Sequence, residues 1–208
     1  MRTKKIFLFD LDGVLIDSKK NMRVSWEMLT KKYNLKIPFI NYSRYIGFPF
    51  LKILKKLKVS PKLYKKFENE YKINSLKNLN FIKIHRGVLK TLKSLKKEKK
   101  IIGILTSKER VRTLAILSKL KIKVDLILCP HKNLNGKPNP KQINNLARKK
   151  RVSKNEIVYV GDMNVDKQTA KNAKVDYIHA NYGYDKKVKT KYSINKINDI
   201  INRNLGIS

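Results

Sequence analysis

The chain has 208 residues, of which 41% are hydrophobic, and this predicts one folded core, with room for a small second domain. The formal net charge is +35, from 50 Lys and Arg residues against 15 Asp and Glu residues. No apolar run is long enough to cross a bilayer, and the short apolar stretch near the N-terminus does not fit a signal peptide. The single cysteine excludes an internal disulfide, so we expect a cytoplasmic protein.

The chain begins with a predicted strand and then changes character. KIFLFDL, at 5–11, is a continuous apolar run, which is typical of a strand buried on both faces. From residue 18 to about residue 79, apolar residues recur at helical spacing, and this predicts helices alone. We therefore expect a helical segment inserted after the first strand.

From residue 87 onwards the sequence predicts strands and helices in alternation. The predicted strands are 101–106, 124–129, 157–162 and 176–180, and the predicted helices are 87–100, 109–120, 139–150, 166–173 and 194–204. Such alternation is typical of a doubly wound, mostly parallel sheet. The expected fold is α/β, with a three-layer core formed by residues 1–17 and 86–208 and a helical cap formed by residues 18–85.

Polar residues stand where several predicted strands end, which is the edge at which parallel sheets carry their sites. Asp10 and Asp12 close the first strand and point roughly the same way, because they are two apart in extended backbone. The other polar residues are Thr106, Ser107, Asp162 and Asp166 at two later strands and Lys137 in the loop NGKPNP. Carboxylates this close repel one another unless one is protonated or a cation lies between them.

These residue types suit a metal ion and a phosphate. An all-oxygen cluster of Asp10, Asp12 and Asp162 fits Mg²⁺, which binds a few carboxylates and keeps several waters. Lys137 would balance the charge and bind a phosphate, and Thr106 would donate a hydrogen bond to the same group. The sequence thus predicts Mg²⁺ and a phosphate at one edge of the sheet.

Four segments resemble the motifs of a known superfamily. FDLDGVLIDS, LTSK, GKPNP and VYVGDMNVDKQTAKNA are similar, in the same order, to the four motifs of the haloacid dehalogenase-like hydrolases, and the likeness extends from Lys5 to about Gly183. The helical segment resembles the small helical cap of that superfamily. RYIGFPFLKIL in the segment and HRGVLKTLKSL after it are similar to the phosphoglycolate phosphatase-like branch.

The resemblance implies a phosphatase reaction with two roles for the first pair of aspartates. Asp10 would be the nucleophile and would form an aspartyl-phosphate. Asp12 would protonate the leaving oxygen and then take a proton from the hydrolytic water. Mg²⁺ would be held by the side chains of Asp10 and Asp162 and by the backbone carbonyl of Asp12. A halide leaving group needs no proton, so Asp12 favours phosphoester chemistry over dehalogenation.

The resemblance also implies how the substrate is bound. Thr106, Ser107 and Lys137 would bind the transferring phosphoryl group. Asp166 would act indirectly, through water or by orienting Lys137. The expected substrate is a phosphate monoester of a small metabolite, such as phosphoglycolate.

Two alternatives remain open at this point. A phosphosugar mutase or a pyrophosphatase of the same superfamily would use the same motifs, although Gly47 is followed by Phe48 and Pro49, without the Arg that often follows that glycine in mutase caps. The net charge of +35 leaves a basic nucleic-acid-binding protein on this fold as an alternative from another class. The lysines are spread along the chain and Asn and Ile are also abundant, so we expect the charge to reflect composition.

Overall fold

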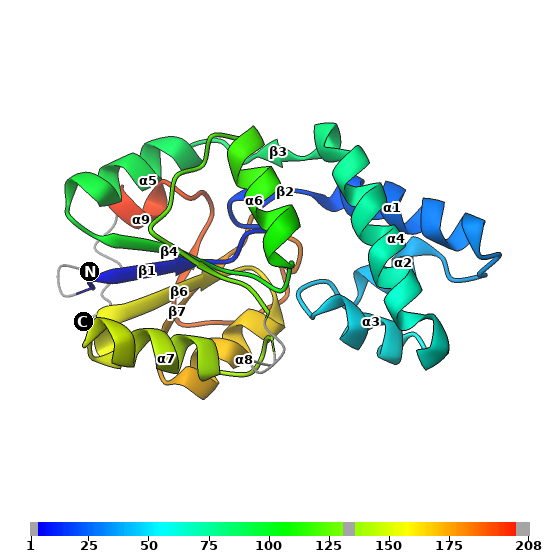
Figure 1. The fold of residues 1–208 in the computed structure, drawn as a ribbon. Helices are drawn as coiled ribbons and strands as arrows, with labels where there is room; N and C mark the ends of the chain where they lie inside the picture. The colour runs from blue at the N-terminus through cyan, green and yellow to red at the C-terminus, as the bar shows by residue number, and fades with distance from the viewer. Residues whose placement is uncertain (1–3, 131–135, 203–208) are drawn as a thin grey trace.

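The computed structural model describes residues 4–130 and 136–202, which contain a six-stranded sheet (Figure 1). In spatial order the strands are β5 (Leu126–Leu128), β4 (Ile101–Leu105), β1 (Ile6–Phe9), β6 (Ile157–Gly161), β7 (Asp176–Ala180) and β8 (Ser193–Ile194). Every neighbouring pair is parallel. The first strand therefore lies inside the sheet, with β4 and β6 on its two sides.

Helices cover both faces of the sheet and complete three layers (Figure 1). On one face, Phe7 and Phe9 join the apolar cluster that includes α5 (Val88–Lys97), α6 (Arg110–Lys119) and α9 (Asp199–Asn202). On the other face, Ile6 and Leu8 join the cluster that includes α7 (Lys141–Lys150) and α8 (Asn164–Ala173). Successive side chains of a strand point to opposite faces, so a strand between two helical layers has to be apolar throughout. The predicted three-layer α/β fold is confirmed.

The C-terminal end of the sheet differs from the prediction. The sequence predicts a helix over 194–204, but β8 occupies Ser193–Ile194 and pairs with β7 through His179↔Ser193 and Ala180↔Ile194. The helix begins only at Asp199, and residues 203–204 lie outside the described part of the chain. A strand of two residues is too short to show a period, so only its pairing with β7 reveals it.

The helical insertion, residues 18–85, follows β2 (Ile16–Asp17), which pairs antiparallel with β3 (Lys83–Ile84) where the chain returns. Its elements are α1 (Lys19–Lys32), α2 (Phe39–Ser43), α3 (Phe50–Lys56), α4 (Tyr64–Lys77) and the 3-10 turns η1 (Pro61–Leu63) and η2 (Leu79–Phe81). Figure 1 shows these helices beside the sheet, past the carboxyl ends of its central strands.

The insertion has an apolar core of its own. Trp26, Leu29, Leu54 and Phe67 are fully buried in a cluster formed almost entirely by residues of the insertion. Within the described part of the α/β core, Met163 and Tyr184, both partly buried, are the residues that join that cluster. We propose on this basis that the boundaries predicted from the sequence separate two domains.

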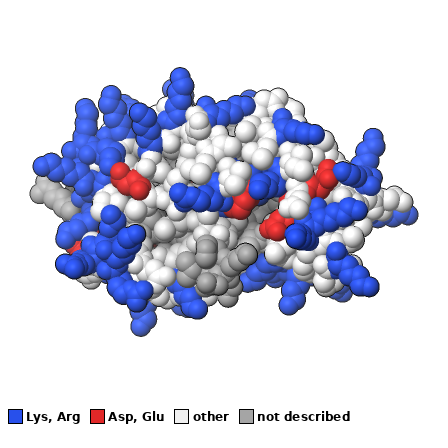
Figure 2. Space-filling view, viewed as in Figure 1, with Lys and Arg blue, Asp and Glu red and all other residues white. Residues whose placement is uncertain are grey.

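The described helices include none that is both long and apolar enough to cross a membrane. The basic side chains are spread widely on the face in Figure 2, where Lys and Arg occur over the α/β core and the insertion alike, with few acidic residues among them. On this face the positive charge is not gathered into one stripe.

Candidate active site

Three strand ends meet at one edge of the sheet and bring the polar residues together. Asp10 directly follows β1, Thr106 follows β4, and Asp162 follows β6. The register pairs Phe9 with Ile104 on one side and with Val160 on the other, so the three strands end level with one another. All three polar side chains are buried, because the helical insertion and the loops after the strands cover this edge.

Two glycines make room for the Asp162 side chain. Gly13 has a φ of +87°, and a Cβ at this position would lie 2.1 Å from Asp162 Oδ2. A Cβ at Gly183 would lie 2.2 Å from Asp162 Cβ. The chain after β1 and the loop after β7 thus approach the carboxylate more closely than any other residue type would allow.

Lys137 joins two of the carboxylates. Its Nζ lies 2.7 Å from Asp10 Oδ1 and 2.7 Å from Asp166 Oδ1. Tyr159 also donates to Asp166 Oδ1, at 2.7 Å, and the backbone N–H groups of Asp162 and Met163 donate to Asp166 Oδ2. Both oxygens of Asp166 are therefore occupied within the protein, and this carboxylate holds Lys137 in place.

The buried carboxylates of this cluster would be stabilised by a further cation. Burial raises the pKa of Asp10 to about 7, with Lys137 acting in the opposite direction. Burial also raises the pKa of Asp162 well above its usual range, and the charges of Asp166 and Asp10 add to the effect. A divalent cation between Asp10 and Asp162 would stabilise both charged forms.

The residues present fit a hard metal ion. Asp10, Asp162 and Asp166 each offer an oxygen, and these atoms all lie within 4.8 Å of one another. Asp162 Oδ1 is buried and has no hydrogen-bond partner among the described residues, whereas Oδ2 accepts the N–H of Tyr184 at 2.7 Å. Because Asp166 is already occupied by its four donors, Asp10 and Asp162 are the carboxylates best placed to bind a metal ion.

Asp12 points away from this cluster, toward the helical insertion. Ser18 Oγ donates a hydrogen bond to its Oδ1, and Lys108 Nζ lies 3.3 Å from its Oδ2. Lys108 is 6% exposed and directly follows the strand end that carries Thr106 and Ser107. Burial lowers the pKa of Lys108, against the attraction of Asp12. The two aspartates of the first motif thus have separate surroundings.

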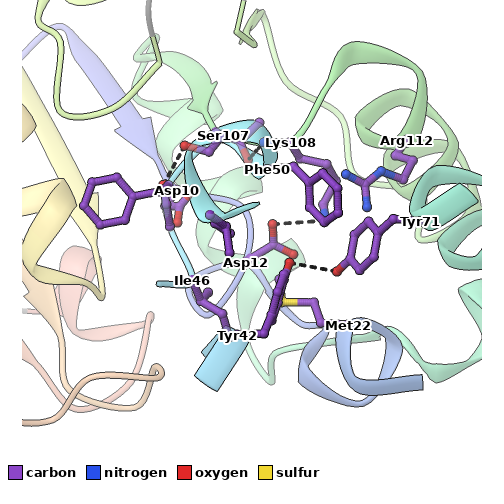
Figure 3. A pocket seen from close by; sticks show the side chains of 14 residues that line it. Asp10, Asp12, Met22, Tyr42, Ile46, Phe50, Tyr71, Ser107, Lys108 and Arg112 are labelled. Carbon is purple, nitrogen blue, oxygen red and sulfur yellow. Dashed lines mark hydrogen bonds and ion pairs between the residues drawn. The ribbon is translucent and has the colours of Figure 1, made fainter. Parts of the chain in front are cut away.

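A small pocket separates Asp10 and Asp12 from the insertion (Figure 3). Its volume is about 40 Å³, room for a few water-sized groups. The insertion contributes mostly apolar and aromatic side chains, namely Met22, Tyr42, Ile46, Phe48, Phe50, Ile53 and Tyr71. The α/β core contributes Thr106, Ser107, Lys108 and Arg112 besides the two aspartates.

The far wall of the pocket combines a cation with two hydroxyl groups. Tyr42 and Tyr71 face each other with their hydroxyl oxygens 2.9 Å apart, and the Arg112 guanidinium lies 5.1 Å from the centre of the Tyr71 ring (Figure 3). Glu109 holds the Arg112 Nε at 2.8 Å from both of its carboxylate oxygens. Arg112 is 6% exposed, so its position is fixed before any ligand arrives.

The two hydroxyl residues predicted to bind phosphate have different contacts. Thr106 is 2% exposed, lines the pocket and accepts the N–H of Lys108 at 3.1 Å. Ser107 Oγ donates to the Gly47 carbonyl oxygen of the insertion at 2.6 Å, so its proton is directed to the insertion. A phosphate-binding role for Ser107 stays a prediction.

The structure thus brings all the predicted residues to one edge of the sheet, in two groups. One group is Asp10, Lys137, Asp162 and Asp166, and the other is Asp12, Thr106 and Ser107 next to the insertion. Residues that the sequence did not single out are Ser18, Tyr42, Tyr71, Lys108, Arg112, Tyr159 and Tyr184. Lys108 could have been found by the strand-end rule, but the other contacts depend on tertiary structure.

Comparison with known proteins identifies the family. The model of the family described as haloacid dehalogenase-like hydrolase matches residues 7–180. The chain therefore belongs to the haloacid dehalogenase-like hydrolases, and the resemblance predicted from the four motifs is confirmed. The prediction of an enzyme is confirmed with it, because this is a hydrolase family.

Relatives of this chain include proteins of similar length. It is 26% identical over 186 residues to the protein named phosphoglycolate phosphatase from Aquifex aeolicus (strain VF5), covering 88% of this chain and 87% of that protein. A hydrolase from Pseudomonas syringae superposes with a TM-score of 0.83 at 22% identity, over 96% of this chain and 97% of that one. A haloacid dehalogenase-like family hydrolase from Streptococcus pneumoniae gives 0.84 at 15% identity, over 97% and 99%. At these identities the two structures establish the fold.

Proposed function

We propose that this hydrolase is a Mg²⁺-dependent phosphatase that cleaves a phosphate monoester of a small metabolite. The observation that carries the proposal is the separation of two carboxylates at one strand end. Asp10 is bound to Lys137 beside the unpartnered Asp162 Oδ1, whereas Asp12 lies on the pocket side between Ser18 and Lys108. Two carboxyl groups with different surroundings suit a nucleophile and a proton carrier.

The reaction would take place in two transfers. Asp10 attacks the phosphorus, the bond to the leaving oxygen breaks, and Asp12 gives its proton to that oxygen. A water molecule then attacks the aspartyl-phosphate, Asp12 takes a proton from the water, and inorganic phosphate and free Asp10 are released. Burial raises the pKa of Asp10 to about 7 against the opposing effect of Lys137, so a further cation such as Mg²⁺ would favour the ionised form that attacks the phosphorus.

The phosphoryl group would be bound from the side of the metal cluster. Mg²⁺, held by Asp10 and Asp162, would neutralise charge on the phosphoryl oxygens when bound. Lys137 already lies 2.7 Å from Asp10, so it can contact a phosphoryl oxygen at the point of attack. Asp166 keeps Lys137 at that place, and the Thr106 hydroxyl can donate to another oxygen from the pocket wall.

Lys108 provides a link between proton transfer and the bound substrate. Here both oxygens of Asp12 face donors, Ser18 at Oδ1 and Lys108 at Oδ2. A protonated Asp12 must donate from one oxygen, so a proton on Oδ2 requires Lys108 to turn to another partner. An anionic group on the substrate would be that partner.

The size and the charges of the pocket favour a small substrate whose leaving group carries negative charge. A volume of about 40 Å³ leaves little room beyond the phosphate while the insertion lies as it does here. Lys108 and Arg112 supply two buried cations on the side of Asp12, where the leaving group would lie. Phosphoglycolate, the substrate in the name of the Aquifex aeolicus relative, has a carboxylate close to its phosphate and meets both requirements.

The alternatives have less support in the structure. A phosphosugar mutase or a pyrophosphatase would also use the two buried cations, but a sugar ring needs far more space than this pocket offers. A nucleic-acid-binding protein needs an extended basic stripe, whereas the cations in Figure 2 are spread over both parts of the molecule.

Phosphate release from a panel of small phosphate monoesters tests the proposal. We expect activity that requires Mg²⁺ and is highest for substrates with a carboxylate near the phosphate. The Asp10→Asn variant should lose about 1,000-fold or more in kcat while it keeps its fold. Asp125→Asn is the matched control, because Asp125 precedes β5 at the opposite end of the sheet. Full activity in Asp10→Asn, or none in the wild type, would contradict the proposal.

A further inference from the structure

Tyr184, in the loop after β7, contacts both groups of aspartates. Its backbone N–H donates to Asp162 Oδ2 at 2.7 Å. Its hydroxyl oxygen accepts the backbone N–H of Ser18 at 2.9 Å and lies 3.2 Å from Ser18 Oγ. Ser18 Oγ in turn donates to Asp12 Oδ1. Tyr184 therefore bonds to Asp162 through its backbone and to Ser18, the hydrogen-bond donor to Asp12, through its side chain.

The direction of these hydrogen bonds follows from counting protons. A serine hydroxyl has one proton, and Ser18 uses it to donate a hydrogen bond to the Asp12 carboxylate. The bond between the Ser18 and Tyr184 hydroxyls must then use the tyrosine proton, so Tyr184 donates to Ser18 Oγ. The result is a chain of donors from Tyr184 through Ser18 to Asp12, in which each bond strengthens the next.

Ser18 hydrogen-bonds to Asp12 instead of capping the helix that follows it. It directly precedes α1, at the position where a serine side chain often accepts the N–H of the third helical residue. Its hydroxyl makes no such bond, and Asp17 Oδ1 accepts the N–H of Lys19 instead. The loss of such a cap lowers helix stability. The fully buried Ser18 hydroxyl therefore donates to Asp12 and does not cap α1.

The chain of donors also spans the junction between the two parts of the molecule. Ser18 lies between β2 and α1, where the chain enters the helical insertion, while Tyr184 belongs to the loop after β7. The Tyr184 ring packs against the apolar cluster of the insertion. A movement of the insertion that displaced Ser18 from Tyr184 would leave the Asp12 carboxyl without this support.

We propose that Tyr184 is a positioning residue that holds the Asp12 carboxyl, through the Ser18 hydroxyl, in the orientation that serves the leaving oxygen. The inference rests on the proposed phosphatase function. It adds that proton transfer by Asp12 depends on the insertion lying in the position seen here. The Tyr184 side chain does not line the pocket beside Asp10 and Asp12.

Leaving groups that differ in their need for a proton test this role. The alkoxide of an alkyl phosphate must be protonated as it departs, whereas the acetate of acetyl phosphate departs as a stable anion. The Tyr184→Phe variant keeps the ring and loses the hydroxyl. We expect kcat/KM to fall about tenfold for the best alkyl phosphate of the panel and less than about twofold for acetyl phosphate. A merely structural role would lower both values equally.

The chain offers a matched control and an independent second variant. Tyr182 lies in the same loop and donates to the Val14 carbonyl oxygen at 3.1 Å, so Tyr182→Phe removes a comparable hydroxyl that does not reach Asp12. Ser18→Ala removes the same link from the other side, without changing the tyrosine. We expect Ser18→Ala to show the same substrate-dependent loss, and Tyr184→Phe to add nothing in the Ser18→Ala background. Circular dichroism and thermal unfolding confirm that each variant is folded.

The outcomes separate the inference from the function on which it rests. Equal losses on both substrates, additive effects of the two variants, or the same loss in Tyr182→Phe would overturn the role of Tyr184 and leave the phosphatase intact. A wild-type protein that hydrolyses neither substrate with Mg²⁺ would overturn the proposed function, and the inference with it.

Discussion

The two walls of the pocket are built on different principles. The wall formed by the α/β core carries charges held in ion pairs, Asp10 with Lys137 and Asp12 with Lys108. The wall formed by the helical insertion is aromatic and apolar, and its polar atoms are the hydroxyl groups of Tyr42 and Tyr71. Under the proposed function, the core would provide the chemistry and the insertion would control which substrates reach it.

The two walls also differ in what holds them in place. Residues of the core wall follow central strands of a six-stranded sheet and are tied to their neighbours by backbone pairing. Side-chain contacts fasten the insertion wall to the core, among them Ser107 to the Gly47 carbonyl and Arg112 over the Tyr71 ring. Changes in the core wall should therefore cost both stability and activity, and changes in the insertion wall should act on substrate choice.

The largest expected effect is on the charged core wall. Lys137→Met leaves two buried carboxylates without their cation, which should lower the free energy of unfolding by about 3 kcal/mol at pH 8 in the absence of Mg²⁺. Because the pKa of Asp10 is raised to about 7 even with Lys137 present, its carboxyl becomes neutral as the pH falls, and the loss should shrink toward pH 5. Urea unfolding at the two pH values measures the effect. A loss independent of pH would contradict the pairing.

A second experiment asks whether the core wall binds a metal by itself. Saturating Mg²⁺ should raise the midpoint of thermal unfolding of the wild type by about 5 °C. Asp162→Asn should abolish this shift, since it removes the negative charge of the carboxylate to which the unpartnered Oδ1 belongs. Glu27→Gln, on the exposed face of α1, is the control and should keep the full shift. Equal shifts in Asp162→Asn and the wild type would place the metal elsewhere.

Lys108 lies where the two walls meet, and its replacement sharpens the comparison. Lys108→Met should lower kcat/KM about tenfold for a phosphate monoester with a carboxylate, relative to a neutral alkyl phosphate. Lys55→Met, at an exposed position of α3, controls for the general positive field of the protein. An unchanged ratio between the two substrates would show that Lys108 does not recognise the leaving group.

The smallest expected effect is on the aromatic wall. Tyr42→Phe removes one hydroxyl of the buried Tyr42–Tyr71 pair and should cost about 1 kcal/mol of unfolding free energy. Turnover of the best substrate should change less than about threefold, because the two tyrosine hydroxyls bond to each other while Asp12 is held by Ser18 and Lys108. A much larger loss of kcat would mean that the insertion takes part in the chemistry, and the comparison of the two walls would fail.

The core wall could be predicted from the sequence because its residues obey local rules. Continuous apolar runs identify the buried strands, and the polar residues that follow them must meet at one edge of a parallel sheet. This reasoning places Asp10, Thr106 and Asp162 together, as the structure does. It failed for β8, whose two residues are too few to form a pattern.

The insertion wall could not be predicted in the same way. Apolar spacing identifies its helices, but Tyr42 and Tyr71 become neighbours only when α2 packs against α4. The link from Tyr184 to Ser18 joins residues 166 positions apart, with no motif to relate them. Such contacts depend on tertiary packing, for which helical period and strand period carry no signal.

The central claim is that Asp10 at the end of β1 is the nucleophile, and trapping its acyl-phosphate tests this most directly. Wild-type protein is allowed to turn over its best phosphate monoester with Mg²⁺ and is treated with sodium borohydride, which reduces an aspartyl-phosphate to homoserine. Peptide mass spectrometry should find homoserine at position 10 and at no other aspartate, and none when substrate is omitted. Turnover that leaves Asp10 unmodified under conditions that trap a known acyl-phosphate, or modification at Asp12 instead, would contradict the account.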